Sequence, residues 1–182
     1  MRMVAALTLL LVLHMSAPTG LLAKVFYAKE EAIRAAFPEA DAIDKQTFFL
    51  TDDQKRQVET LARARLDSKL VTLYMGKRGQ KLLGYAMIDV HTVRTLPEAV
   101  MVVLSPEGRV NSTLILAFYE PLEYLPNERW LKQFDQRSLT PDLRVGGGIA
   151  GITGATLTTR GVTDAVRRAL ALYQVLIAKG GQ

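Results

Sequence analysis

The chain has 182 residues, of which 49% are hydrophobic and 23% charged, so it can form one domain with a hydrophobic core and is too apolar to be disordered. It contains no cysteine, which excludes disulfides, thiolate catalysis, iron–sulfur clusters and haem attachment through cysteine. The net charge of +5 arises from basic residues interspersed with acidic ones, which favours a solvated surface over nucleic-acid binding.

The first 23 residues are predicted to be a targeting segment. Arg2 precedes an apolar run from Val4 to Leu13, as in a secretory signal peptide. The apolar character resumes a few residues later, so residues 4–23 also approach the ~20 residues of a membrane-spanning helix. Both alternatives, a signal peptide and an uncleaved anchor, predict that residues 24–182 form a periplasmic or otherwise extracytoplasmic domain.

Two helices are predicted before the first strongly apolar strands. Residues 29–36 form a short helical segment that Pro38 ends. Thr51 followed three residues later by Gln54 has the spacing of a capping box, and the helix that starts there is expected to run to about Leu66.

Four strands in two hairpins are predicted next. A turn from Gly76 to Gly79 is expected to join the first two strands, and a Pro-Glu-Gly turn at residues 106–108 the last two. Tight turns between consecutive strands indicate an antiparallel sheet. The predicted strands are Leu70–Tyr74, Leu82–Val90, Glu98–Leu104 and Val110–Phe118.

The last helix has the clearest pattern, after a brief helix predicted over residues 127–134. Thr158 or Thr159 is its expected N-cap, and Gly180-Gly181 its expected end. The predicted fold class is α+β, an antiparallel sheet of about four or more strands with helices packed on one face and a long C-terminal helix. Apolar residues recur along one stripe of that helix at Val162, Ala165, Val166, Ala169, Leu170, Tyr173, Leu176 and Ile177.

Residues 153–159, before this stripe, combine small residues with four threonines. Small residues let a ligand approach the backbone, free N–H groups at a helix start bind anions, and Arg160 is adjacent. Residue types alone support a phosphate site and a threonine-rich turn without ligand equally. The chain lacks a Walker lysine and a strand–GxGxxG–helix unit, which disfavours nucleotide hydrolysis and Rossmann-type binding.

The run Thr153-Gly154-Ala155-Thr156-Leu157-Thr158 resembles the (Ser/Thr)-Gly-Ala-Thr-x-(Thr/Ser) motif of the FMN-binding domain family. That family includes periplasmic flavin subunits of sodium-pumping NADH:quinone oxidoreductases and Rnf-type complexes, and standalone relatives. The resemblance covers about residues 84–176. It includes Gly84-Tyr85-Ala86, Pro106-Glu107-Gly108, Glu120-Pro121 and Trp130-Leu131-Lys132-Gln133-Phe134.

The resemblance implies that FMN is the cofactor, and that a flavin transferase esterifies its phosphate to Thr156. No catalytic residue and no metal ligand is predicted, because one histidine without clustered acids falls short of the usual ligand number. Arg94 and Glu98 are expected to form a surface ion pair or to contact flavin or a partner. The predicted cofactor-binding residues are Thr156 as covalent anchor, with Thr153, Gly154, Ala155, Leu157, Thr158, Thr159, Tyr119, Glu120 and His91.

Two of these residues have alternative interpretations. His91 either faces the flavin within a polar cluster or is a hydrogen-bonded strand residue. Tyr119 either stacks on the flavin ring or belongs to the core, as aromatic side chains more often do; the same applies to Tyr124 and Trp130.

One position departs from the family pattern, because Ala150 stands where the family has an aspartate three residues before the motif. This departure leaves covalent FMN, non-covalent FMN and no flavin as alternatives. The leading hypothesis is an electron carrier, not a self-contained enzyme, that meets redox partner proteins at the outer face of a membrane. The alternatives are a flavin-less structural subunit of a membrane redox assembly and a periplasmic sensor that binds free flavin or another phosphorylated ligand.

Overall fold

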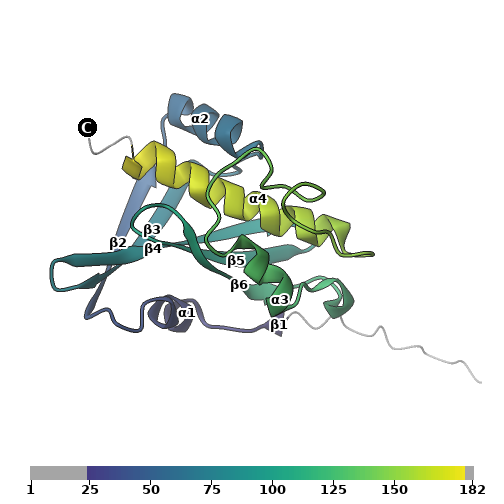
Figure 1. Ribbon diagram of the computed structural model, residues 1–182, viewed down its shortest axis with the longest axis horizontal. Coiled ribbons are helices and arrows are strands. Elements are labelled where there is room, and N and C mark those ends of the chain that lie inside the picture. Colours follow the sequence, from purple (N-terminus) through teal and green to yellow (C-terminus); the bar gives the residue numbers. More distant parts are fainter. Residues whose placement is uncertain (1–23, 179–182) are drawn as a thin grey trace, which may run out of the picture.

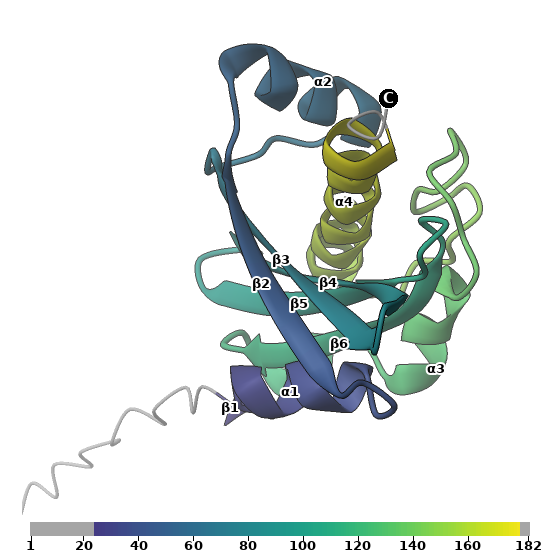
Figure 2. The ribbon, with the colours of Figure 1, turned by 90° about the vertical axis from the view of Figure 1, so that its left-hand side faces the viewer.

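The computed structural model describes residues 24–178, and its centre is a six-stranded antiparallel sheet in the order β1-β6-β5-β4-β3-β2 (Figures 1 and 2). The predicted α+β class, antiparallel sheet and long C-terminal helix are confirmed. The strands are β1 Lys24–Val25, β2 Ala42–Phe49, β3 Leu70–Arg78, β4 Lys81–Thr92, β5 Pro97–Leu104 and β6 Val110–Phe118. The helices are α1 Lys29–Ala36, α2 Asp52–Ala62, α3 Glu128–Leu131 and α4 Thr156–Tyr173, with short 3-10 turns at Leu122–Tyr124 and Lys132–Phe134 and a π-helical turn at Gln174–Ala178.

The two outer strands, β1 and β2, were not predicted. β2 is an edge strand paired only with β3, and most of its side chains are exposed, so its sequence lacks the apolar alternation of a half-buried strand. The predicted first hairpin turn is wrong. The chain turns at Gly79, whose φ is +57°, whereas Gly76 lies inside β3, where the ring of Phe37 leaves no room for a side chain.

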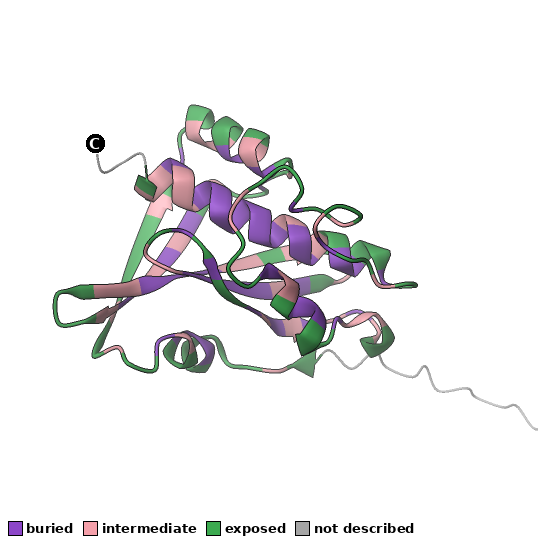
Figure 3. Cartoon of the chain, viewed as in Figure 1, coloured by how far each residue is buried: buried purple, intermediate pink, exposed green. Residues whose placement is uncertain are grey.

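Helices cover both faces of the sheet, which corrects the expectation of one covered face (Figure 2). α2 and α4 pack on one face, against residues that include Met87 and Val102. α1 packs on the other, where Ile33 and Phe37 meet Met101. β5 explains the arrangement, because its residues from Val100 to Leu104 are an uninterrupted apolar run buried on both sides (Figure 3).

The helix ends follow local rules. Thr51 Oγ1 accepts from the backbone of Gln54 at 3.1 Å, and Gln54 Oε1 accepts from the backbone of Thr51 at 3.0 Å, so the predicted capping box is confirmed. α2 ends at Ala62 instead of Leu66, because Arg63 adopts a left-handed conformation with φ of 53°.

Some predictions lie outside the described residues. They are the targeting segment, residues 1–23, and the glycine stop at residues 180–181. Among residues 24–178, no helix has the length and apolarity needed to cross a membrane.

A buried arginine in the middle of α4 forms hydrogen bonds with the end of α2 and with the loop at residues 140–143. Arg167 is 4% exposed and donates to the carbonyl groups of Leu61 and Ala62 at the end of α2, at 3.1 and 2.5 Å. It also donates to those of Thr140 and Leu143, at 3.0 and 2.9 Å. The last carbonyls of a helix have no partner within the helix, so the guanidinium both satisfies them and complements their negative potential.

We expect the substitution Arg167→Met to lower the free energy of unfolding by about 3 kcal/mol or more, because buried carbonyl groups then lose their donors. Arg129→Met, at an exposed position of α3, is the matched control and should change it by less than about 0.5 kcal/mol. Urea denaturation measures both. Equal effects of the two substitutions would show that Arg167 does not hold α2 and α4 together.

Candidate functional site

The motif segment makes the first turn of α4. The helix begins at Thr156, and Thr158 and Thr159 are buried inside it, with exposures of 2% and 0%, so the prediction that either is the N-cap is wrong. Gly154, with φ of +84°, turns the chain into the helix, and Ala155 occupies the N-cap position without a side-chain hydrogen bond. The buried hydroxyl of Thr159 is satisfied by donating to the carbonyl of Thr156 at 3.1 Å.

This start leaves the positive end of the helix open to a ligand. The first backbone bond of α4 runs from Thr159 N–H to the carbonyl of Ala155 at 3.0 Å, so the N–H groups of residues 156–158 have no acceptor within the helix. The side chain of Thr156 is exposed, and nothing lies within 4 Å of the position that a side chain of Gly154 would take. Free donors, an accessible hydroxyl and open backbone are what a phosphate ester requires.

A small cleft joins the motif to the segment after β6. It is lined by Arg94, Glu120 and Tyr124 on one side and by Gly154, Ala155, Leu157 and Thr158 on the other. The structure therefore brings together Glu120 and most of the motif residues that the sequence singled out.

Glu120 supports one wall of that cleft. Its Oε1 accepts from the backbone N–H groups of Arg94, Thr95 and Leu96 at 3.2, 2.9 and 3.0 Å. The hydrogen bond from Thr95, followed by those from its neighbours, lowers the pKa of Glu120 below its ordinary value. The guanidinium of Arg94 lies 5.0 Å from the ring centre of Tyr124 and forms a cation–π contact.

The aromatic candidates separate into different environments. Tyr119 is half-buried and does not line the cleft, whereas Tyr124 does. Trp130 is buried, and its Nε1 donates to the carbonyl of Ala150 at 2.7 Å. The N–H of Ala150 donates to Gln133 Oε1 at 2.8 Å, so both backbone polar groups of Ala150 are hydrogen-bonded. Its side chain is exposed.

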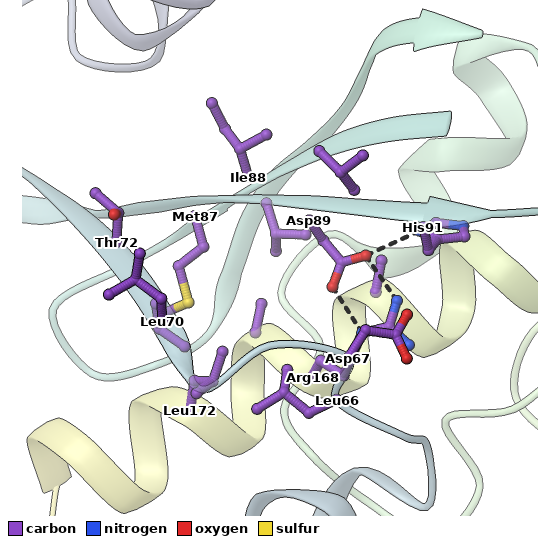
Figure 4. A pocket seen from close by; sticks show the side chains of 15 residues that line it. Leu66, Asp67, Leu70, Thr72, Met87, Ile88, Asp89, His91, Arg168 and Leu172 are labelled. Carbon is purple, nitrogen blue, oxygen red and sulfur yellow. Dashed lines mark hydrogen bonds and ion pairs between the residues drawn. The ribbon is translucent and has the colours of Figure 1, made fainter. Parts of the chain in front are cut away.

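His91 belongs to a buried polar network (Figure 4). Its Nδ1 lies 2.8 Å from Asp89 Oδ1, and its Nε2 lies 3.2 Å from Glu98 Oε2. Arg168 donates to both oxygens of Asp89 at 2.6 Å. The expected surface ion pair of Arg94 with Glu98 is wrong, because Glu98 is 0% exposed and stands directly opposite His91 in the β4–β5 register.

The His91 network lies close to the motif, because His91 packs against α4 one turn beyond the motif residues. A side chain at Gly161 would come within 2.6 Å of His91 Nε2, so the glycine lets the imidazole lie against the helix. His91 and Leu157 line one shallow hollow, together with Val93 and Arg160. Arg168 was missed by sequence reasoning, which treated the helix only as an apolar stripe; a charged residue directly beside that stripe was the available signal.

Residues 97–171 match the sequence model of the family described as FMN-binding domain. This match supports the assignment of these residues to that family. The match to the FMN-binding domain spans β5, β6, α3 and most of α4, and therefore includes Glu120 and the motif but not His91. No curated protein matches the chain.

The residues present fit FMN. Its phosphate is complementary to the free N–H groups at residues 156–158 and to the exposed hydroxyl of Thr156. Leu157 is 44% exposed and offers an apolar contact beside the anchor, where a flavin ring can cover it.

The His91 network should make stability depend on pH. Burial opposes both charged forms, but the hydrogen bonds from Arg168 and His91 lower the pKa of Asp89 to about 2, and contacts with Asp89 and Glu98 raise that of His91 to about 9. Asp89 therefore stabilises the fold above its ordinary pKa of 3.8, and this stabilisation is lost as the pH falls toward 2. His91 stabilises the fold below its ordinary pKa of 6.5, and this stabilisation is lost as the pH rises toward 9.

We therefore expect the joint contribution of Asp89 and His91 to the free energy of unfolding to be greatest between about pH 4 and 6.5, and to fall by roughly 2–3 kcal/mol on each side. Urea denaturation at a series of pH values measures this profile. In His91→Gln the decline between pH 6.5 and 9 should become smaller; an unchanged decline would contradict the assignment to His91.

Proposed function

We propose that this chain is an extracytoplasmic electron carrier, or a subunit of a membrane redox assembly, with FMN esterified to Thr156. The observation that carries the proposal is the position of Thr156. Its exposed side chain is the first of α4, next to N–H groups without helical acceptors, in a chain whose residues 97–171 match the FMN-binding domain family. When bound, FMN supplies the electron transfer, and the chain's own residues supply position and electrostatics.

Different residues of the chain have different roles in this proposal. The N–H groups of the first turn of α4 hold the phosphate, and Arg160, exposed one turn later, adds positive charge beside it. Glu120 keeps residues 94–96 in place as the far wall of the cleft. The exposed anchor makes the cofactor accessible to redox partner proteins and to the flavin transferase that loads it.

The location outside the cytoplasm rests on the amino-terminal sequence. An arginine followed by a long apolar run is typical of an exported or membrane-anchored chain. Redox partner proteins at the outer face of the membrane follow from that location and from the resemblance to periplasmic flavin subunits.

The covalent bond is tested by exporting the full chain together with a flavin transferase and denaturing the purified protein. Fluorescence that stays with the polypeptide, and a mass increase equal to FMN minus water, are expected for the wild type and lost in Thr156→Val. Thr153→Val is the matched control, because Thr153 is also exposed and lies in the same motif, and this variant should retain the ester. Flavin still attached to the Thr156→Val chain would overturn the assignment.

A second candidate function, a structural subunit without flavin, is favoured by Ala150. The exposed side chain and the backbone held by Trp130 and Gln133 leave room for an aspartate there without rearrangement. If Ala150 limits recognition by the transferase, Ala150→Asp should raise the loaded fraction several-fold, as measured by intact mass. A wild-type chain and an Ala150→Asp chain that both remain without flavin, covalent or free, would favour the structural subunit instead.

A further inference from the structure

The most unusual group in the described part of the chain is the carboxylate of Glu98. It lies on β5 with 0% exposure, and among residues 24–178 neither of its oxygens accepts a hydrogen bond of normal geometry. His91 Nε2, at 3.2 Å, is within ion-pair distance but outside hydrogen-bond geometry. A buried carboxyl group held this loosely can exist either as an anion paired with an imidazolium or as a neutral acid.

We propose that Glu98, through its contact with His91, takes up a proton when the neighbouring flavin is reduced and releases it on reoxidation. In this role Glu98 does not contact the cofactor; its protonation offsets the negative charge that the cofactor gains. The inference rests on the proposed function, because it requires FMN at Thr156.

Proximity to the anchor is the first support. Gly161 lies five positions after Thr156, which corresponds to about 7.5 Å along the helix. The imidazole of His91 lies against Gly161 and lines the same hollow as Leu157. The phosphate and ribityl chain of FMN are long enough to span this distance, so the hollow would be within reach of a ring anchored at Thr156.

The charges around His91 are the second support. With Asp89 ionised, and with His91 and Arg168 protonated, the network carries one positive charge when Glu98 is neutral and none when Glu98 is ionised. Burial raises the pKa of Glu98, which brings its titration closer to neutral pH. The charged groups that face His91 are Asp89 from β4, Glu98 from β5, Arg160, Asp164 and Arg168 from α4, and Arg65 and Asp67 from the segment before β3.

A route for the proton is the third support. A cavity of about 110 Å³ lies between β3, β4 and α4, with Met87 and Leu172 among its apolar lining and Asp89, His91 and Arg168 at its polar end (Figure 4). A volume of this size beside polar partners is sufficient to hold water. His91 thus meets space for water on one side and buried Glu98 on the other.

Reduction of the loaded protein by two electrons would be accompanied by the uptake of two protons. In the FMN-loaded protein, two electrons from a redox partner protein and one proton from solvent would add one negative charge to the cofactor. A second solvent proton adds to a Glu98 carboxylate oxygen and gives the neutral acid, so the network gains the positive charge that offsets the flavin. Reoxidation returns both electrons to a partner and both protons to solvent.

The test uses the FMN-loaded full chain and follows two-electron reduction by infrared difference spectroscopy. A new band of a protonated carboxylic acid is expected in the wild type and should be absent from Glu98→Gln. Asp164→Asn is the matched control, because Asp164 is a half-buried acid lining the same hollow, and burial raises its pKa as well. The band should persist in Asp164→Asn.

The midpoint potential gives a second readout. Each proton taken up with two electrons contributes about 30 mV per tenfold change in proton activity, so Glu98→Gln should reduce the slope of potential against pH by that amount. A slope reduced instead by Asp164→Asn would overturn the assignment to Glu98.

The outcomes separate this inference from the proposed function. A native protein without FMN would contradict both. A loaded wild-type protein whose reduction produces no protonated-carboxyl band would overturn only the role of Glu98, and this measurement stands even if Glu98→Gln fails to fold.

Discussion

The position of α4 on the sheet governs the geometry of the candidate site. Two consecutive buried arginines set this position. Arg167 binds the carbonyl groups that end α2 and those of the 140–143 loop, and Arg168 forms a two-pronged ion pair with Asp89 of β4. Because a helix is stiff, contacts about three turns along it also determine where Thr156 lies.

The same position of α4 creates the polar network inside an otherwise apolar interface. A buried arginine needs an anion or several carbonyls, and Asp89 supplies the anion for Arg168. Asp89 in turn orients His91, because its carboxylate accepts a hydrogen bond from Nδ1 of the imidazole. This places the other ring nitrogen, Nε2, beside Glu98. Gly161 is the small residue that makes this close approach possible. The same contacts therefore hold α4 in place and set the charges beside the candidate flavin site.

Local rules account for the elements that the sequence predicts correctly. The capping box at Thr51, the hairpin strands flanking residues 106–108 and the apolar stripe of α4 depend on neighbours a few residues away, and all three are present. Elsewhere, tertiary contacts override local preference. Thr158 and Thr159 resemble caps, but they are buried because the turn at Gly154 starts the helix earlier.

Periodicity, turn chemistry and motif spacing are properties of the local chain. The α+β class, the antiparallel hairpins and the motif similar to that of the FMN-binding domain family can therefore be read from the amino-acid sequence. Three features depend instead on how distant segments pack: helices cover both faces of the sheet, Glu98 is buried against His91 instead of paired with Arg94, and Arg168 contacts Asp89. Those contacts join residues as many as 79 positions apart. Their partners are chosen by packing and by the need to neutralise buried charge, which no local pattern records.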